Sequence, residues 1–148
     1  MNPTGNPLLN AYVFGWDRLG QYYVFTNSLE SGYGCWLYSY GDCELLVEEL
    51  PLNPDTYITT LEPGWNLVGN PHQPPHDITM LLFEYQGSYY DWTEATTDNN
   101  PTNNPLINPY IFGWNQNQYY EFASEFIAGE AYWVYSYSHC QVRATTWK

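Results

Sequence analysis

Positive charge is the scarcest property of this 148-residue chain. Its only basic residues are Arg18, Arg143 and Lys148, against sixteen Asp and Glu residues, and the formal net charge is −13. A surface of this sign repels nucleic acid and anionic lipid, and three scattered cations cannot form a basic patch. The many aromatic residues therefore do not indicate a platform for stacking nucleic-acid bases.

Long apolar runs are missing as well. No run approaches the roughly 20 residues that a membrane-spanning helix needs, and the N-terminus lacks the basic and apolar regions of a signal peptide. We therefore expect no membrane insertion. If the protein is exported, the sequence corresponds to a mature form or an excised fragment.

Charged residues of either sign make up only 13% of the chain, whereas Phe, Trp and Tyr make up 20%. This charged fraction is about half of the usual ~25%. Uncharged polar residues, Tyr and Pro must then supply most of the surface, a composition that favours a secreted or cell-surface protein. The length suits one domain, or two small lobes that share a core.

The chain contains an internal repeat. The matching segments are 2–16 with 100–114, 21–25 with 118–122, and 36–40 with 133–137. Cys43 has its counterpart in Cys140. A repeat of this kind indicates a duplicated structural unit rather than an active site, because catalysis usually needs unlike groups in one place.

The duplication is incomplete. The segment 61–71, Leu-Glu-Pro-Gly-Trp-Asn-Leu-Val-Gly-Asn-Pro, has no counterpart ahead of the first copy. We therefore interpret 1–47 as a partial repeat unit, 48–60 as a connector and 61–148 as a complete unit, both packed as one compact domain. A unit without its Gly-Trp-Asn-Leu strand leaves an unfilled sheet edge, which a neighbouring chain can complete by strand addition.

The local pattern predicts an all-β fold. Residues 12–16 and 21–25 are rich in β-formers and flank a turn-like segment, which indicates a hairpin that recurs in the second copy. The predicted architecture is a pseudo-twofold duplicated antiparallel β-sandwich or barrel-like domain, built from aromatic hairpins, with at most one short helix. The segment 77–82 is the only plausible helix, with Asp77 as its N-cap.

A family resemblance rests on two segments. Residues 61–71, followed by Ala-Gly-Glu-Ala-Tyr-Trp-Val-Tyr at 128–135, resemble the Gly-Trp-Asn-Leu repeat modules of large secreted and cell-surface proteins of bacteria; similar patterns occur in archaea. The resemblance implies a non-catalytic β-rich appendage, and it implies location more than activity. This chain departs from the pattern by carrying His72 and His76 after the motif and a cysteine in each copy.

Two groups of residues have the side-chain types of a metal site. His72 and His76 are four residues apart, but the prolines between them forbid the helix that would bring them together, so a loop over a hydrophobic edge is the alternative. Asp91, Glu94 and Asp98 offer oxygen ligands for calcium, without the alternation of a calcium-binding loop, and a solvated acidic loop is the alternative. Calcium is the only cofactor that this pattern suggests.

Catalytic patterns are weak. Glycoside hydrolysis needs two carboxylates that face each other across a cleft, and nothing singles out a pair among Glu84, Asp91, Glu121 and Glu125. The Gly-x-Ser-x-Gly elbow of serine hydrolases is absent from the sequence. The prediction is that the protein is not an enzyme.

The cysteines allow one bridge between the copies. Cys43 and Cys140 occupy equivalent positions, so a pseudo-twofold axis can bring them together as a disulfide and leave Cys35 free. A bridge between Cys35 and Cys43 is disfavoured, because the predicted turn at Gly41 puts them on opposite faces. Ordinary buried thiols are the alternative.

The aromatic residues supply the candidate ligand or interface positions. These are Trp16, Tyr22, Tyr23, Tyr85, Tyr89, Trp114, Tyr119 and Tyr120. Exposed Tyr and Trp on a β-surface stack on sugar rings or anchor protein interfaces. Neighbours in each Tyr-Tyr pair point to opposite faces, so we expect one member in the core and one exposed. Trp36, Trp65 and Trp133 are expected in the core.

These observations favour a non-catalytic extracellular or cell-surface structural module, with self-assembly into a fibre, filament or layer as one form of it. Its expected partners are copies of itself or adjacent modules. The alternative is a carbohydrate-binding, lectin-like module of a secreted protein, with glycans as partners.

Overall fold

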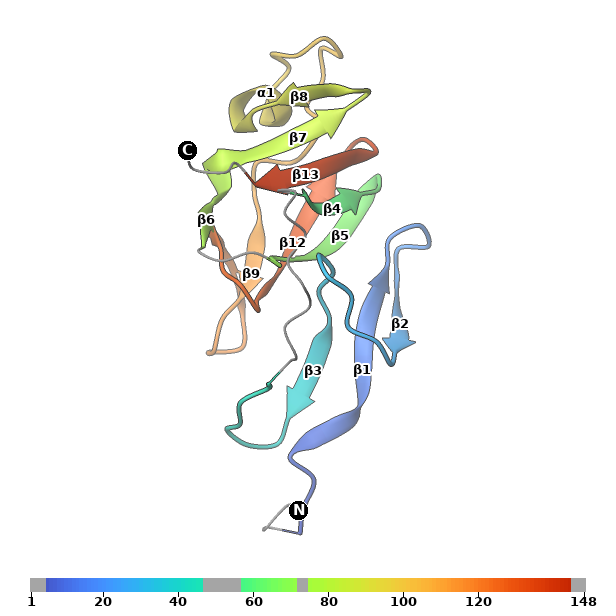
Figure 1. Ribbon diagram of the computed structural model, residues 1–148, viewed down its shortest axis with the longest axis vertical. Helices are drawn as coiled ribbons and strands as arrows, with labels where there is room; N and C mark the ends of the chain where they lie inside the picture. The colour runs from blue at the N-terminus through green and yellow to red at the C-terminus, as the bar shows by residue number, and fades with distance from the viewer. Residues whose placement is uncertain (1–4, 47–56, 72–74, 145–148) are drawn as a thin grey trace.

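The computed structural model describes residues 5–46, 57–71 and 75–144 and has the predicted all-β fold. Its strands form antiparallel sheets, joined by one five-residue helix and one 3-10 turn (Figure 1). Within the described residues, no helix has the length and apolarity to cross a membrane.

The first copy forms a three-stranded sheet. Its strands are β1 (Leu9–Asp17), β2 (Tyr22–Thr26) and β3 (Trp36–Ser39), in the order β2-β1-β3. The hairpin turn is closed by the Asp17 carboxylate, which accepts hydrogen bonds from the backbone N–H groups of Leu19 and Gly20. Gln21 completes the turn at a positive φ of 59°, and its counterpart Gln118 has a φ of 64°.

The second copy repeats this sheet and adds a strand. The repeated strands are β9 (Phe112–Trp114), β10 (Tyr120–Phe122) and β12 (Ala131–Ser136). The added strand is β5 (Gly64–Gly69), which carries the Gly-Trp-Asn-Leu motif, so the order is β10-β9-β12-β5. The edge of β12 that β5 covers corresponds to the outer edge of β3 in the first copy.

A further four-stranded sheet covers the second copy. It consists of β4 (Tyr57–Leu61), β13 (Cys140–Ala144), β7 (Leu81–Tyr85) and β8 (Ser88–Tyr90), in the order β4-β13-β7-β8. The small pair β6 (His76–Asp77) and β11 (Glu125–Phe126) lies beside it. Strand β4 begins within the predicted connector 48–60 and pairs with β13.

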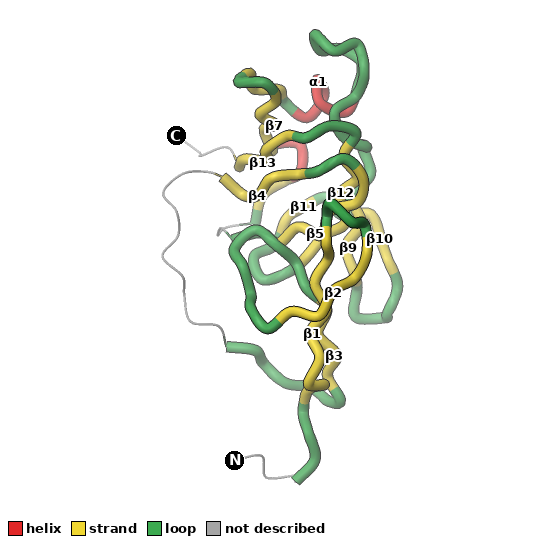
Figure 2. The backbone as a smooth tube through the Cα atoms, turned by 90° about the vertical axis from the view of Figure 1, so that its right-hand side faces the viewer, coloured by secondary structure: helices red, strands yellow, loops and turns green. Residues whose placement is uncertain are grey.

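The hydrophobic core lies between the two four-stranded sheets. Its fully buried members include Val68 of β5, Val134 of β12, Phe83 of β7 and Val142 of β13. Figure 2 shows β1 and β3 extending away from these layers, toward the N-terminus. The core therefore belongs to the second copy, and the first copy adjoins it.

The helical prediction is wrong in position. Asp77 does cap a helical turn, because its carboxylate accepts a hydrogen bond from the Thr79 N–H, but the turn is a 3-10 turn at Ile78–Met80 and β7 follows at once. The α-helix is α1 (Trp92–Thr96), which begins at Asp91. From Leu81 onward the apolar residues form strand β7, which pairs with β13. Pairing in the sheet therefore overrides the short helical signal.

Candidate functional site

Six aromatic side chains join the two copies in a reciprocal arrangement, which we call the aromatic interface. It consists of Trp16, Tyr23 and Trp36 from the first copy and of Trp114, Tyr120 and Trp133 from the second. Each β3 or β12 tryptophan packs edge-on against the tryptophan and tyrosine of the other copy's hairpin. This is the pattern of an isologous, twofold contact.

The distances repeat across the interface. Trp16 and Trp133 have ring centroids 5.0 Å apart at 90°, and Trp114 and Trp36 have centroids 5.1 Å apart at 87°. Tyr23 lies 6.2 Å from Trp133, and the equivalent tyrosine of the second copy lies 6.2 Å from Trp36. T-shaped pairs at these separations add about 0.5–1.5 kcal/mol each beyond the area they bury. The duplicated rings therefore hold the copies together.

Strand alternation places these rings on one face. In β1 and β2, Phe14 is opposite Phe25 and Trp16 is opposite Tyr23. Side chains two residues apart share a face of a strand, so this face carries the aromatic residues. The opposite face of the second copy packs into the core, which leaves the aromatic face available to meet the first copy.

Strand β5 anchors the first copy by hydrogen bonds to its backbone. The Trp16 Nε1–H donates to the Trp65 carbonyl at 2.7 Å. The Gln21 amide accepts from the Trp65 N–H at 2.7 Å and donates to the Trp65 carbonyl at 3.0 Å. Further along the same edge of this strand, the Gly34 N–H donates to the Leu67 carbonyl at 3.0 Å. Both edges of β5 are thus engaged, one by β12 and the other by the first copy.

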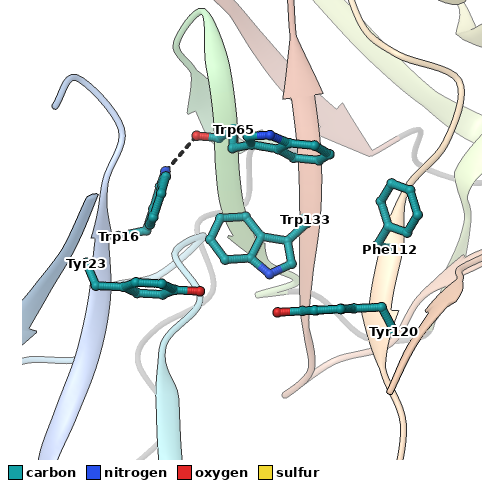
Figure 3. Close-up of a pocket in the computed structure, with 6 residues that line it drawn as sticks. All are labelled: Trp16, Tyr23, Trp65, Phe112, Tyr120 and Trp133. Atoms are coloured by element: carbon teal, nitrogen blue, oxygen red, sulfur yellow. Dashed lines mark hydrogen bonds between the residues drawn. The ribbon is translucent and has the colours of Figure 1, made fainter. Parts of the chain in front are cut away.

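An aromatic pocket of about 390 Å³ opens at this junction (Figure 3). Its six lining residues are Trp16, Tyr23, Trp65, Phe112, Tyr120 and Trp133. In Figure 3 the hydroxyl groups of Tyr23 and Tyr120 point toward each other from the two copies, with Trp133 between β1 and β9. A smaller hollow of about 250 Å³ is lined by Phe14, Tyr23 and Trp36, the counterparts of Phe112, Tyr120 and Trp133.

Polar groups at the aromatic interface are few. Partial burial raises the pKa of the Tyr23 phenol, and the nearby Tyr120 hydroxyl adds to the increase. The buried Trp36 Nε1–H lies beside the Tyr23 hydroxyl and opposes part of this increase in pKa. Chemically, the site can bind apolar or ring-shaped surfaces, and it offers few directional hydrogen bonds.

The structure brings together four of the eight predicted aromatic positions. Trp16, Tyr23, Trp114 and Tyr120 meet at the aromatic interface. The remaining four, Tyr22, Tyr119, Tyr85 and Tyr89, lie elsewhere.

Those four positions fall into two groups. Tyr22 and Tyr119 are exposed on the other side of their hairpins, and because Tyr23 and Tyr120 are also exposed, the expectation of one core member in each pair is wrong. Tyr85 packs against the core from β7, while Tyr89 is exposed on β8 with the Arg143 guanidinium 5.9 Å from its ring centre.

Sequence reasoning misplaced part of the site. Trp133 is buried as expected, but Trp65 is exposed and lines the aromatic pocket, so its assignment to the core is wrong. Phe112 and its counterpart Phe14 were not singled out. Their signal was available, since each lies two residues before a selected tryptophan on the same strand face.

The predicted disulfide is not formed. Cys35, Cys43 and Cys140 are all free; Cys140 is buried in the core, whereas Cys43 is exposed. The contact between the copies is made by their aromatic faces. Cys43 and Cys140 come after β3 and β12 in the chain and do not lie on these faces. Burial raises the pKa of the Cys140 thiol to about 11.

The calcium candidates have a local structural role. Asp91 and Glu94 form a capping box, in which the Asp91 carboxylate accepts from the Glu94 N–H at 2.9 Å and Glu94 accepts from the Asp91 N–H at 3.0 Å. Asp98 is exposed in the loop after α1. The described parts of the chain contain no group of three or more His, Cys, Asp or Glu side chains placed to hold a metal. His72 lies outside the described residues, and His76 is buried in β6.

The carboxylates considered for catalysis lie on separate elements. Glu84 of β7 forms an ion pair with Arg143 at 2.9 Å, Glu121 accepts a hydrogen bond from Asn115, and Glu125 is exposed on β11. Together with Asp91 at the helix cap, they do not line the aromatic pocket.

Comparison with known proteins finds no match: no family model, no curated protein and no solved structure is significantly similar to this chain.

Proposed function

We propose that this protein is a non-catalytic structural module of a cell-surface or extracellular assembly, and that it associates with copies of itself or with adjacent modules through its first copy. The observation that carries the proposal is the difference in burial between equivalent residues of the two copies.

The first copy leaves exposed or half-buried an apolar face that the second copy buries. We define this open face by Leu8, Val13, Leu37 and Leu45, whose counterparts are the core residues Leu106, Ile111, Val134 and Val142. Leu8 is 44% exposed and Leu106 is 1% exposed. Leu45 is 57% exposed and Val142 is 2% exposed. Val13 and Leu37 are half-buried, whereas Ile111 and Val134 are fully buried. Apolar side chains left uncovered on a surface mark interaction sites.

The outer edge of β3 adjoins the open face. Within the described residues no strand pairs with this edge, whereas β5 pairs with the equivalent edge of β12. An unpaired strand edge presents N–H and C=O groups that another chain can pair with. Face and edge together offer both apolar area and directional hydrogen bonds to a partner.

Charge sets the conditions for such an association. The chain carries a formal net charge of −13, so two copies repel each other at low ionic strength. Salt screens this repulsion, with a Debye length of about 10 Å at 0.1 M, while apolar burial is not weakened. Association through the open face should therefore strengthen as salt is added.

The test is the light-scattering mass of the purified chain over a wide range of protein and salt concentration, with negative-stain images of the same fractions. The expected result is a mass that rises with protein concentration and with salt concentration. The Leu45→Glu variant should have a lower mass under the same conditions. Leu19→Glu is the matched control, because Leu19 is an exposed leucine at a hairpin tip away from the open face. A strictly monomeric wild-type chain under all conditions would refute self-association.

Carbohydrate binding is a second candidate, favoured by the aromatic pocket. Tryptophan and tyrosine rings stack on sugars, and this pocket is lined by six aromatic side chains. A polysaccharide panel tests it by thermal protection, since a ligand that binds only the folded state raises the melting temperature. Protection that Tyr120→Ala removes would support this function.

A further inference from the structure

The geometry points to the chemistry of the partner: the outer edge of β3 accepts an extended Gly-Trp-Asn-Leu-Val-Gly segment from another module, antiparallel to β3 and in the register that β5 has on β12. This inference rests on the proposed function and names the partner of the same surface. It is carried by the second copy, which displays the occupant of the equivalent edge.

The register follows from the pairing of β5 with β12. Six consecutive pairs join these strands, from Ala131 opposite Gly69 to Ser136 opposite Gly64. The counterparts of 131–136 in the first copy are residues 34–39. An incoming segment in the same register therefore places its Trp opposite Tyr38 and its Val opposite Cys35. The free edge ends at Cys35, because the preceding residue, Gly34, already donates to the Leu67 carbonyl of β5.

The surface beside β3 already has the ring spacings of the equivalent surface beside β12, which β5 covers. Tyr38 and Tyr40 have ring centroids 5.3 Å apart, and their counterparts are 5.2 Å apart. Phe14 and Phe25 are 4.9 Å apart, and their counterparts are 5.2 Å apart. A preformed surface loses little conformational entropy when a partner binds.

The first copy also has an exposed aromatic position where the tryptophan of the segment can bind. In the second copy Trp65 packs against Tyr135 with a centroid distance of 5.1 Å and against Phe112 at 6.0 Å. The counterparts of these two residues, Tyr38 and Phe14, are both exposed, and Tyr38 is 64% exposed. The hollow of about 250 Å³ is lined in part by Phe14. A tryptophan bound at this edge would line it in the way that Trp65 lines the larger pocket.

The segment can be short because it carries its own turn. The Asn66 side chain is fully buried and donates to the carbonyls of Glu62 and Gly64 at 2.9 and 3.0 Å, while it accepts from the Glu62 N–H at 2.9 Å. Gly64 has a φ of 107°, which a side chain rarely tolerates. These contacts are local, so a free segment can form the same turn.

The β5 strand of another folded copy does not meet this need. Its two edges are already bonded, to β12 on one side and to the Gly32–Gly34 segment on the other, where the Gly69 N–H donates to the Gly32 carbonyl at 3.2 Å. The partner is therefore a module whose Gly-Trp-Asn-Leu strand is free, which adds to β3 by β-augmentation.

The experiment uses a fluorescently labelled peptide of residues 61–71 and the full chain. Saturable binding by anisotropy is expected, and the Trp65→Ala peptide should bind at least ~10-fold more weakly, as losing a buried aromatic anchor does. Tyr38→Ala in the chain should weaken binding likewise. Tyr89→Ala is the matched control, because Tyr89 is an exposed tyrosine of the other sheet, and it should leave the affinity unchanged.

The register is tested by a cross-link to Cys35. A Val68→Cys peptide activated as a 2-pyridyl disulfide is added to a Cys43→Ser chain at mildly alkaline pH, since burial raises the pKa of the Cys35 thiol. The Cys35 thiolate attacks the peptide sulfur, a new disulfide forms, and pyridine-2-thione leaves. Directly opposed strand residues have the Cα separation that a disulfide needs, so the Val68→Cys peptide should react faster than a Leu67→Cys peptide.

The outcomes separate this inference from the proposed function. A chain that self-associates through Leu45 but does not bind the peptide refutes the inference and retains the proposed function. A monomeric chain that binds and cross-links the peptide supports strand addition and refutes self-assembly. Equal cross-linking of the two cysteine peptides overturns the register.

Discussion

The two copies have almost the same local structure and very different burial. The Tyr40 N–H donates to the Leu8 carbonyl at 2.8 Å, and the counterpart bond from Tyr137 to Leu106 is also 2.8 Å long. Yet Leu8 is 44% exposed and Leu106 is fully buried. The comparison teaches that local sequence specifies the hairpins, whereas the sheet β4-β13-β7-β8 decides which of them has a core.

The largest expected effect contrasts one pair of equivalent leucines. Leu106→Ala should reduce the free energy of unfolding by about 2–5 kcal/mol, because it leaves a cavity in a packed core. Leu8→Ala should cost less than about 1 kcal/mol, since its side chain is exposed. Chemical denaturation of both variants measures the difference, and equal losses would contradict the burial contrast.

The contact between the copies is tested by a pair of glycines. A Cβ at Gly34 would lie 2.5 Å from the Ala131 Cβ and 2.7 Å from the Leu67 Cγ, so Gly34→Ala should destabilise the protein by about 1–3 kcal/mol through overpacking. Gly41 has no atom within 4 Å of such a Cβ, so Gly41→Ala is the control and should be nearly neutral. A neutral Gly34→Ala would mean that the copies are not packed in this way.

A smaller effect separates the equivalent tryptophans of the aromatic interface. Trp16→Phe removes the hydrogen bond to the Trp65 carbonyl and should cost about 1 kcal/mol more than Trp114→Phe. Trp114 faces the first copy, whose sheet has, within the described residues, no counterpart of β5 to accept a hydrogen bond from its indole N–H. Thermal unfolding of the two variants and the wild type gives the difference. Equal losses would show that the Trp65 contact adds no stability.

The last effect concerns pH and is absent at neutral pH. Burial raises the pKa of the Cys140 thiol from an ordinary 9.0 to about 11, so the folded state holds this proton more tightly than the unfolded state. Stability from this group is complete below pH 9 and is lost as the pH rises toward 11. The melting temperature should therefore fall between pH 9 and 11, and by less in Cys140→Ala. Burial also raises the pKa of Tyr132 to about 12, so the loss of stability continues to higher pH. This second contribution is present in the wild type and in Cys140→Ala.

Much of the fold was predictable because it depends on patterns of two to fifteen residues. The alternating aromatic residues and turn signals predict the β1-β2 and β9-β10 hairpins, and the missing motif predicts the open edge of β3. The helix was misplaced although its capping box, Asp91 with Glu94, has a recognisable sequence spacing.

The candidate site was predictable only in part. Duplication identified Trp16, Tyr23, Trp114 and Tyr120 as special, but it does not specify which ring meets which. The cross-copy pairing depends on how two sheets dock, and contacts between residues about one hundred positions apart leave no periodic pattern. The wrong disulfide has the same origin, because equivalent positions meet only if they lie near the twofold axis.

The sequence by itself determined the repeat, the hairpins, their turns and the strand faces. The contact of Ser39 with Cys43 at 3.3 Å and that of Ser136 with Cys140 at 3.7 Å show how closely the local geometry follows the repeated residues. The tertiary structure decided which copy is buried and where the aromatic faces meet. The physical reason is that hydrogen bonds within a hairpin are local, whereas burial depends on what another part of the chain, or a partner, places on the exposed face.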